Sequence, residues 1–153
     1  SLQSNSNPYT PAVNLVFALD EALKMMREEG LDNIFRRHNK HKLAMSNAVK
    51  ALNLKLFANE KYLSPSITAI KTEGMDAEEF RKTIKSNFDI LLAGGQDHLK
   101  GKIFRVGHLG YVNDRDIITV VSAMSRTLLE MGRITAQQAG EALVEVSKYL
   151  EEN

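Results

Sequence analysis

The sequence predicts an α+β fold in which a small antiparallel or mixed sheet of about four strands is covered largely on one face by helices. Several segments carry apolar residues at spacings of three and four, which is typical of amphipathic helices. Between these segments lie short, partly alternating apolar runs bounded by glycine, proline or asparagine, as expected for strands. The predicted order is helix, helix, two strands, helix, two strands, helix, helix.

The first two elements are predicted as helices. Thr10 and Pro11 mark the start of the first, because threonine can cap a helix and proline fits its first position. Gly30 ends it. Its apolar stripe consists of Val16, Leu19, Leu23 and Met26. A second helical pattern runs from about Asp32 to Asn53.

The period then changes, and residues 54–58 and 67–71 are predicted as neighbouring strands. Asp76, with Glu79 three residues later, resembles a capping box and predicts a helix that continues to about Phe88.

Two more strands are predicted around residues 90–92 and 103–106, with a glycine-rich loop over 94–101 between them. An asparagine cap predicts a helix over 113–132. A threonine with a glutamine three residues later predicts the last helix, over 135–152.

Composition bounds the class of protein. The 153 residues suffice for one domain, which we place at 10–153, with 1–9 as a linker or expression remnant. The chain opens without an initiator methionine, so we expect a processed product, a remnant or a piece of a longer protein. Twenty Lys+Arg against 19 Asp+Glu give a formal charge of +1, which argues against a nucleic-acid partner.

The sequence contains no cysteine, which excludes disulfides, iron–sulfur clusters and thiolate zinc sites within these residues. No apolar run approaches the ~20 residues that cross a bilayer, and no signal sequence opens the chain. We therefore expect a cytoplasmic protein with no membrane partner.

The basic run over 36–42 is predicted to be a solvated helix surface, because on a helix its charges spread around the axis and no aromatic residue is interleaved. His38 and His41 could share a metal ion. No carboxylate lies one turn away to complete the site, so we predict a structural role and no metal.

Two further features leave alternatives open. Gly94-Gly95 lacks the phosphate-loop fingerprints and is either a flexible connection or a mobile loop bordering a site. Alternation along the predicted strand places Ile103, Arg105 and Gly107 on one face. An arginine in an apolar strand needs an anion, either an acidic side chain in a salt bridge or the carboxylate or phosphate of a substrate.

The sequence contains no nucleophile elbow, no paired carboxylates on one short element and no zinc-protease motif. It therefore predicts no complete catalytic site within this chain.

Four segments stand out when they are taken together: Tyr9–Leu15, Glu28–Asn33, Arg37-His38 and Gly101–Gly110. Together they resemble the C-terminal small domain of class V aminotransferases, which are enzymes of fold type I that depend on pyridoxal phosphate. The resemblance is to the alanine–glyoxylate and serine–glyoxylate branch, which includes cyanobacterial relatives labelled as a small subunit of soluble hydrogenase. The final helix matches no motif of the family.

The resemblance implies roles for individual residues. Arg105 matches the arginine that binds the substrate α-carboxylate. Thr10 matches a threonine that contacts the phosphate of a cofactor held mainly by the other subunit of a homodimer. Tyr9 is a weaker candidate for cofactor contact, because the family's tyrosine stands three positions before that threonine, where this chain has Asn7. The lysine that holds the cofactor belongs to a large domain that would precede Ser1.

The resemblance therefore implies part of a transaminase that moves an amino group between a small amino acid, alanine or serine, and a 2-oxo acid such as glyoxylate. This chain alone would be inactive. The alternative is a non-catalytic α+β binding or assembly module on the same scaffold. The hydrogenase label has no chemical support in these residues, because such metal centres need cysteine thiolates.

Overall fold

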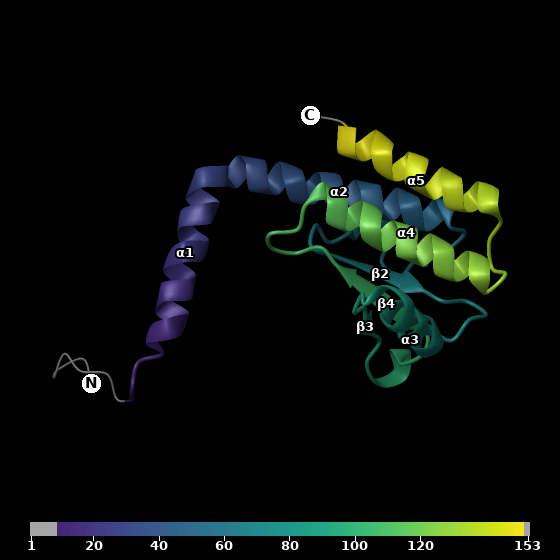
Figure 1. The fold of residues 1–153 in the computed structure, drawn as a ribbon, viewed down its shortest axis with the longest axis horizontal. Coiled ribbons are helices and arrows are strands. Elements are labelled where there is room, and N and C mark those ends of the chain that lie inside the picture. Colours follow the sequence, from purple (N-terminus) through teal and green to yellow (C-terminus); the bar gives the residue numbers. More distant parts are fainter. Residues whose placement is uncertain (1–8, 152–153) are drawn as a thin grey trace. The chain divides into compact units, whose positions relative to one another are not determined.

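The structure is a computed structural model that describes residues 9–151. It divides into two compact units, residues 1–36 and 37–153, which we describe separately. Whether residues 10–153 act as one domain stays a prediction. The predicted element order is confirmed (Figure 1). The helices are α1 (Val13–Glu29), α2 (Leu31–Ala51), α3 (Ala77–Phe88), α4 (Asp114–Glu130) and α5 (Ala136–Glu151), and the strands are β1 (Lys55–Leu56), β2 (Ile67–Lys71), β3 (Ala93–Gly94) and β4 (Ile103–Gly107).

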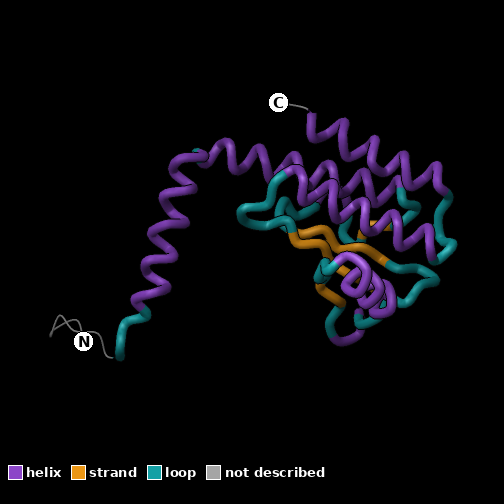
Figure 2. Tube along the Cα trace, in the orientation of Figure 1, coloured by secondary structure: helices purple, strands orange, loops and turns teal. Residues whose placement is uncertain are grey.

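The predicted α+β fold class is confirmed. The strands form a four-stranded sheet in the order β1-β2-β4-β3, and every pair is antiparallel. The central pairing sets Thr68 opposite Val106 and Ile70 opposite Phe104, so these buried side chains share one face of the sheet. Figure 2 shows the orange strands together on one side of the long helices of this unit.

The hydrophobic core lies between that face and the helices of the second unit. On α3, Phe80 packs against Phe104, with ring centroids 4.8 Å apart, a separation typical of favourable aromatic pairs. Further core residues come from α2, α3, α4 and α5 and include Met45, Val49, Ile84, Ile117, Met124, Leu128, Ala142 and Val146. The core thus covers one face of the sheet and leaves Ala69, Arg105 and Gly107 on the other, which we call the open face.

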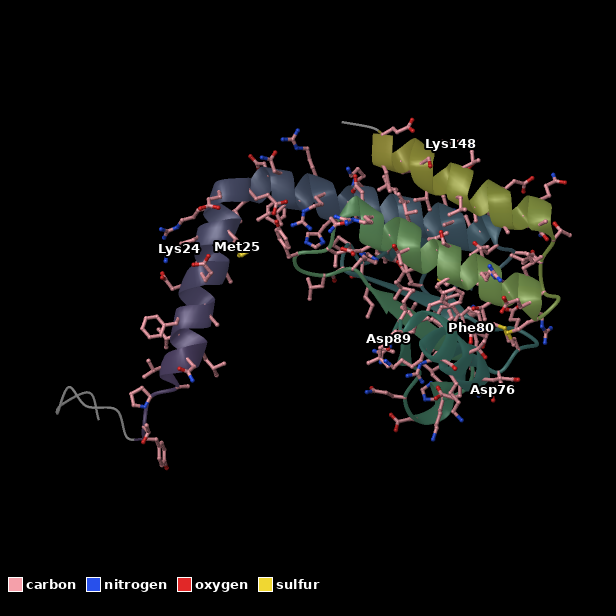
Figure 3. All side chains as sticks on the ribbon, viewed as in Figure 1. Lys24, Met25, Asp76, Phe80, Asp89 and Lys148 are labelled. Carbon is pink, nitrogen blue, oxygen red and sulfur yellow. The ribbon has the colours of Figure 1, made fainter. Side chains whose placement is uncertain are left out.

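Side-chain caps fix the starts of α3 and α4 as predicted. The Asp76 carboxylate accepts the Glu78 backbone N–H at 2.8 Å. Asn113 and Asp116 form a reciprocal capping box at the start of α4. Figure 3 labels Asp76 at the start of α3 and Phe80 within the helix.

Two predicted boundaries are wrong. β3 lies at 93–94 and not around 90–92, because the Leu92 carbonyl accepts a hydrogen bond from Arg81 and pairing with β4 begins at Ala93. α1 begins at Val13, after Ala12, which makes no side-chain cap bond. Thr10 therefore does not cap the helix.

In the first unit, α1 has no buried residue, although it carries the predicted apolar stripe. Lys24 pairs with Asp20 at 2.8 Å on its polar side. Among the described residues, no helix is both long enough and apolar enough to span a membrane.

Candidate functional site

Arg105 lies near the middle of β4 on the open face, as alternation predicted. Its Nε and Nη2 atoms both donate to the carbonyl oxygen of Gly94, at 3.1 and 2.9 Å. Within the described residues the guanidinium forms no ion pair. The acidic partner that one alternative required is therefore not found there, and the charge is offset only by a carbonyl dipole.

The neighbours of Arg105 across the strands are small. Ala69 of β2 and Ala93 of β3 lie directly opposite it, one on each side. Residues directly opposite in antiparallel strands share a face, and their Cβ atoms lie roughly 5 Å apart. On β4 itself, Ile103 and Gly107 lie two residues before and after Arg105 on the same face. The residues directly opposite Arg105 therefore contribute methyl groups, and none of these neighbours is acidic.

The glycine pair Gly94-Gly95 has a packing role. A Cβ at Gly94 would lie 2.6 Å from Nη1 of Arg81, and a Cβ at Gly95 would lie 2.1 Å from the Leu99 carbonyl oxygen. Gly95 thus requires glycine because a backbone atom lies too close for a Cβ, whereas at Gly94 the close atoms are the ends of the Arg81 and Glu78 side chains. The Gly95 N–H also donates to the Ile103 carbonyl at 3.1 Å. The connection borders Arg105 as a tightly packed segment.

The basic run of α2 holds the loop that follows β4. Arg37 Nη1 donates to the carbonyls of Gly110 and Val112, at 2.9 and 2.8 Å. Lys40 and His41 both bind the carboxylate of Asp114, at 2.9 and 2.8 Å. The prediction of a wholly solvated surface is therefore wrong for these three residues, because carbonyls and a carboxylate from a distant segment occupy their donors.

Two histidines of this region are fully buried. His108 Nε2 shares a hydrogen bond with Thr68 Oγ1 at 2.9 Å, and burial together with the nearby His41 lowers the pKa of His108 to about 4. Burial also lowers the pKa of His41, against the opposing effect of Asp114. Among the described residues, no hydrogen-bond partner reaches the buried Nδ1 atoms of His38, His41 and His108. With their lowered pKa values, the rings of His41 and His108 are neutral at pH 7.

For His41 the effect of burial on the pKa outweighs that of the hydrogen bond, whereas for Asp114 the hydrogen bonds outweigh burial. Burial raises the pKa of its carboxyl group, but the hydrogen bonds from Lys40 and His41 outweigh this, and the resulting pKa lies below the ordinary value. Over residues 9–151, no group of three histidine, aspartate or glutamate side chains is arranged to hold a metal ion. The polar cluster of α2 is thus a clamp on the loop before α4.

Thr10 and Tyr9 lie in the first unit, before α1, and both are exposed. The Thr10 hydroxyl has no hydrogen-bond partner among the described residues. The structure gives Tyr9 an exposed ring and no role.

Sequence reasoning missed two groups that bear on Arg105. The Gly94 carbonyl was missed because a main-chain acceptor has no signature in a sequence. Arg81 was missed because it lies on an amphipathic helix, where an exposed arginine is ordinary.

No family model matches the chain. It is 55% identical over 128 residues to the soluble hydrogenase 42 kDa subunit of Anabaena cylindrica, a match that covers 84% of this chain and 33% of that protein. It is 34% identical over 149 residues to the serine–glyoxylate aminotransferase of Methylorubrum extorquens, covering 95% of this chain and 36% of the enzyme.

A crystal structure of ureidoglycine–glyoxylate aminotransferase from Bacillus subtilis matches with a TM-score of 0.83 and 31% identity, over 92% of this chain and 37% of that one. The chain thus spans about a third of the length of the relatives it matches. Fold and sequence agree: the chain matches the C-terminal part of class V aminotransferases, among them the serine–glyoxylate and ureidoglycine–glyoxylate enzymes.

Proposed function

We propose that this chain serves as the C-terminal domain of a cytoplasmic, homodimeric aminotransferase that depends on pyridoxal phosphate. The full enzyme would move an amino group between a small amino acid, alanine or serine, and a 2-oxo acid such as glyoxylate. The role of this chain is to bind the substrate carboxylate through Arg105 and to contribute Thr10 to the cofactor phosphate.

The observation that carries the proposal is that Arg105 has no acidic partner within residues 9–151. A guanidinium on a strand, flanked by Ala69 and Ala93 and bonded among these residues to the Gly94 carbonyl alone, has charge and donors left for an anion. Its donors are spaced to bind both oxygens of a carboxylate in parallel. Held in this way, a substrate would have its α-carbon at a fixed distance from the sheet, which favours reaction through orientation.

The residues of this chain fit only one part of the cofactor. The Thr10 hydroxyl, which has no partner within residues 9–151, suits a phosphate oxygen, which accepts a hydrogen bond. When bound, pyridoxal phosphate would supply the electron-withdrawing ring that lets the substrate α-hydrogen leave as a proton. The lysine that holds the ring and moves that proton is assigned to the large domain, outside this chain.

The exposed apolar stripe of α1 supports a larger assembly. A row of exposed Val16, Leu19 and Leu23 side chains is more apolar than an isolated helix surface usually is. About two thirds of each matched relative lies outside the segment that corresponds to this chain. A large domain and a second subunit would cover such a surface.

The hydrogenase names of the cyanobacterial relatives describe those proteins. The present 153 residues supply no cysteine thiolate to a nickel–iron or iron–sulfur centre. The proposal therefore follows the aminotransferases.

The test is the Arg105→Lys variant of the full-length protein that carries this chain, in single-turnover reactions with alanine and serine. Lysine keeps the charge but loses the parallel pair of donors, so the KM for the amino acid should rise roughly 10- to 100-fold. Cofactor absorbance before substrate addition should stay unchanged. The matched control is Lys102→Met, an exposed cation just before β4. Unchanged kinetics in Arg105→Lys would remove Arg105 from the site, and a wild-type protein without transaminase activity would favour the non-catalytic module.

A further inference from the structure

We infer that Arg81 is a positioning residue for Arg105. Together with Glu78, Arg81 fixes β3 so that the Gly94 carbonyl occupies one edge of the Arg105 guanidinium. The other edge of the guanidinium is then left for the substrate carboxylate. The inference rests on the proposed function and specifies which donors of Arg105 meet the substrate. It is built from contacts on α3, β3 and β4 within the second unit.

The first step is the geometry of the guanidinium. A guanidinium has five N–H donors: one on Nε and two on each Nη. The Gly94 carbonyl accepts from Nε and Nη2, which form the side edge of the group. The two N–H of Nη1 and one of Nη2 remain. One N–H from each of these nitrogens forms the end edge, whereas the second N–H of Nη1 points back along the side chain. A carboxylate can therefore bind in parallel only through Nη1 and Nη2.

The second step is what holds the Gly94 carbonyl in place. β3 has only two residues and lies at the edge of the sheet, so pairing with β4 alone gives it little support. Arg81 supplies the missing attachment, because its Nε donates to the Leu92 carbonyl at 2.7 Å. Leu92 immediately precedes β3.

The third step is the fit of Gly94 against the same side chain. Arg81 Nη1 binds Glu78 Oε2 at 2.7 Å, and both side chains are largely buried, with 22% and 29% of their surfaces exposed. A Cβ at Gly94 would lie 2.6 Å from Arg81 Nη1 and 2.7 Å from Glu78 Oε1. The ion pair thus lies directly against the Gly94 backbone, on the side opposite the open face. One arginine holds β3 by a hydrogen bond before the strand and by contact within it.

The experiment uses the full-length enzyme with Arg81→Met, which keeps most of the side-chain length and removes every donor. Freed from its anchor, β3 would let the Gly94 carbonyl move and Arg105 rotate. The KM for serine should rise about tenfold while kcat changes less than twofold. The inhibition constant of propanoate, a carboxylate without an amino group, should rise by the same factor. A residue that merely stabilises the fold would not change carboxylate affinity selectively.

Three further variants make the outcome decisive. Lys82→Met, an exposed neighbour on α3, should match wild type. Arg81→Lys should restore part of the serine affinity, because one ammonium can still donate to the Leu92 carbonyl. Gly94→Ala, whose Cβ pushes aside the ends of the Arg81 and Glu78 side chains, should reproduce the rise in KM if Arg81→Met does not fold.

The inference fails separately from the proposed function. If Arg105→Lys raises the KM and both Arg81→Met and Gly94→Ala do not, only the positioning role is overturned. If Arg105→Lys has no effect, the carboxylate site itself is wrong. In the Arg105→Lys background, Arg81→Met should add less than twofold, because its effect passes through Arg105, and a full additional tenfold rise would contradict the inference.

Discussion

His41, in the middle of α2, and Asp114, the first residue of α4, are joined by a 2.8 Å hydrogen bond between Nε2 and Oδ1. The imidazole is fully buried, whereas the Asp114 side chain is 43% exposed. The bond links a buried neutral ring to a carboxylate that also binds Lys40 at 2.9 Å and begins a helix. Asp114 thus gives the Nε2 atom of His41 its hydrogen-bond partner and also fixes the end of the loop after β4.

Asp114→Asn should destabilise the chain by about 1 kcal/mol, since it removes a charged acceptor from two donors but acts at a partly exposed site. Urea unfolding followed by circular dichroism measures the change. Arg115→Gln, at the next position and exposed, is the control and should stay within about 0.5 kcal/mol of wild type. Equal stability of Asp114→Asn and wild type would show that the clamp contributes nothing.

Acid should destabilise the chain through His108. Its pKa is about 4 in the folded state and 6.5 in the reference state. Between pH 6.5 and pH 4 the His108 imidazole is therefore protonated in the unfolded chain but neutral in the folded chain. The stabilising contribution is complete above pH 6.5 and is lost as the pH falls to 4, by about 3 kcal/mol. The lowered pKa of His41 acts with the same sign.

Urea titrations between pH 7 and pH 4 measure this loss. His108→Gln should be less stable than wild type at pH 7 but should show a shallower decline on acidification. A decline of the same steepness in both proteins would assign the acid sensitivity to other groups.

Gly95→Ala should be among the most damaging single methyl additions in the chain. The new Cβ would meet the Leu99 backbone oxygen at 2.1 Å, and a backbone atom cannot move aside as a side chain can. A loss of about 1–3 kcal/mol is expected. The matched control is Gly140→Ala in α5, where nothing lies within 4 Å of the added carbon. That variant should gain about 0.5–1 kcal/mol from helix propensity, so opposite signs in thermal unfolding are the expected result.

Thr10→Ala in the full-length protein should weaken pyridoxal phosphate binding about tenfold, the value of one hydrogen bond to a charged acceptor. Thr10→Ser should bind like wild type, because it keeps the hydroxyl. Tyr9→Phe tests the weaker prediction for the neighbouring phenol and should have a smaller effect. Equilibrium titration of the apoenzyme by absorbance gives each dissociation constant, and wild-type affinity in Thr10→Ala would exclude the phosphate contact.

The helices were the most predictable part of the fold. Asn113 and Asp76 cap α4 and α3 as expected, because a short polar side chain before an apolar stripe satisfies backbone donors that only a helix start exposes. The start of α1 was misplaced, since Thr10 and Pro11 have the right chemistry two residues too early. Local rules determine whether a helix forms better than where it begins.

The sequence predicted which face of the sheet the Arg105 charge lies on, but not which groups surround that charge. Alternation along a strand was enough to place Arg105 on the open face. Its partner is a main-chain carbonyl from β3, whose position depends on Arg81 of α3, and neither contact has a local pattern. The short β3 was shifted for the same reason: apolar residues 90–92 resemble a strand, but a side chain takes the Leu92 carbonyl.

The two outermost strands of the sheet have a consequence for self-association. β1 and β3 each contain two residues, so each border of the sheet offers few backbone groups to an incoming strand. Long unprotected borders are the usual route by which sheets join into fibres. Here the longer central strands, β2 and β4, have the short strands β1 and β3 on their outer sides. Copies of this chain that do associate should therefore pair through side chains, with no gain in β-structure, a difference that infrared spectra of concentrated samples would record.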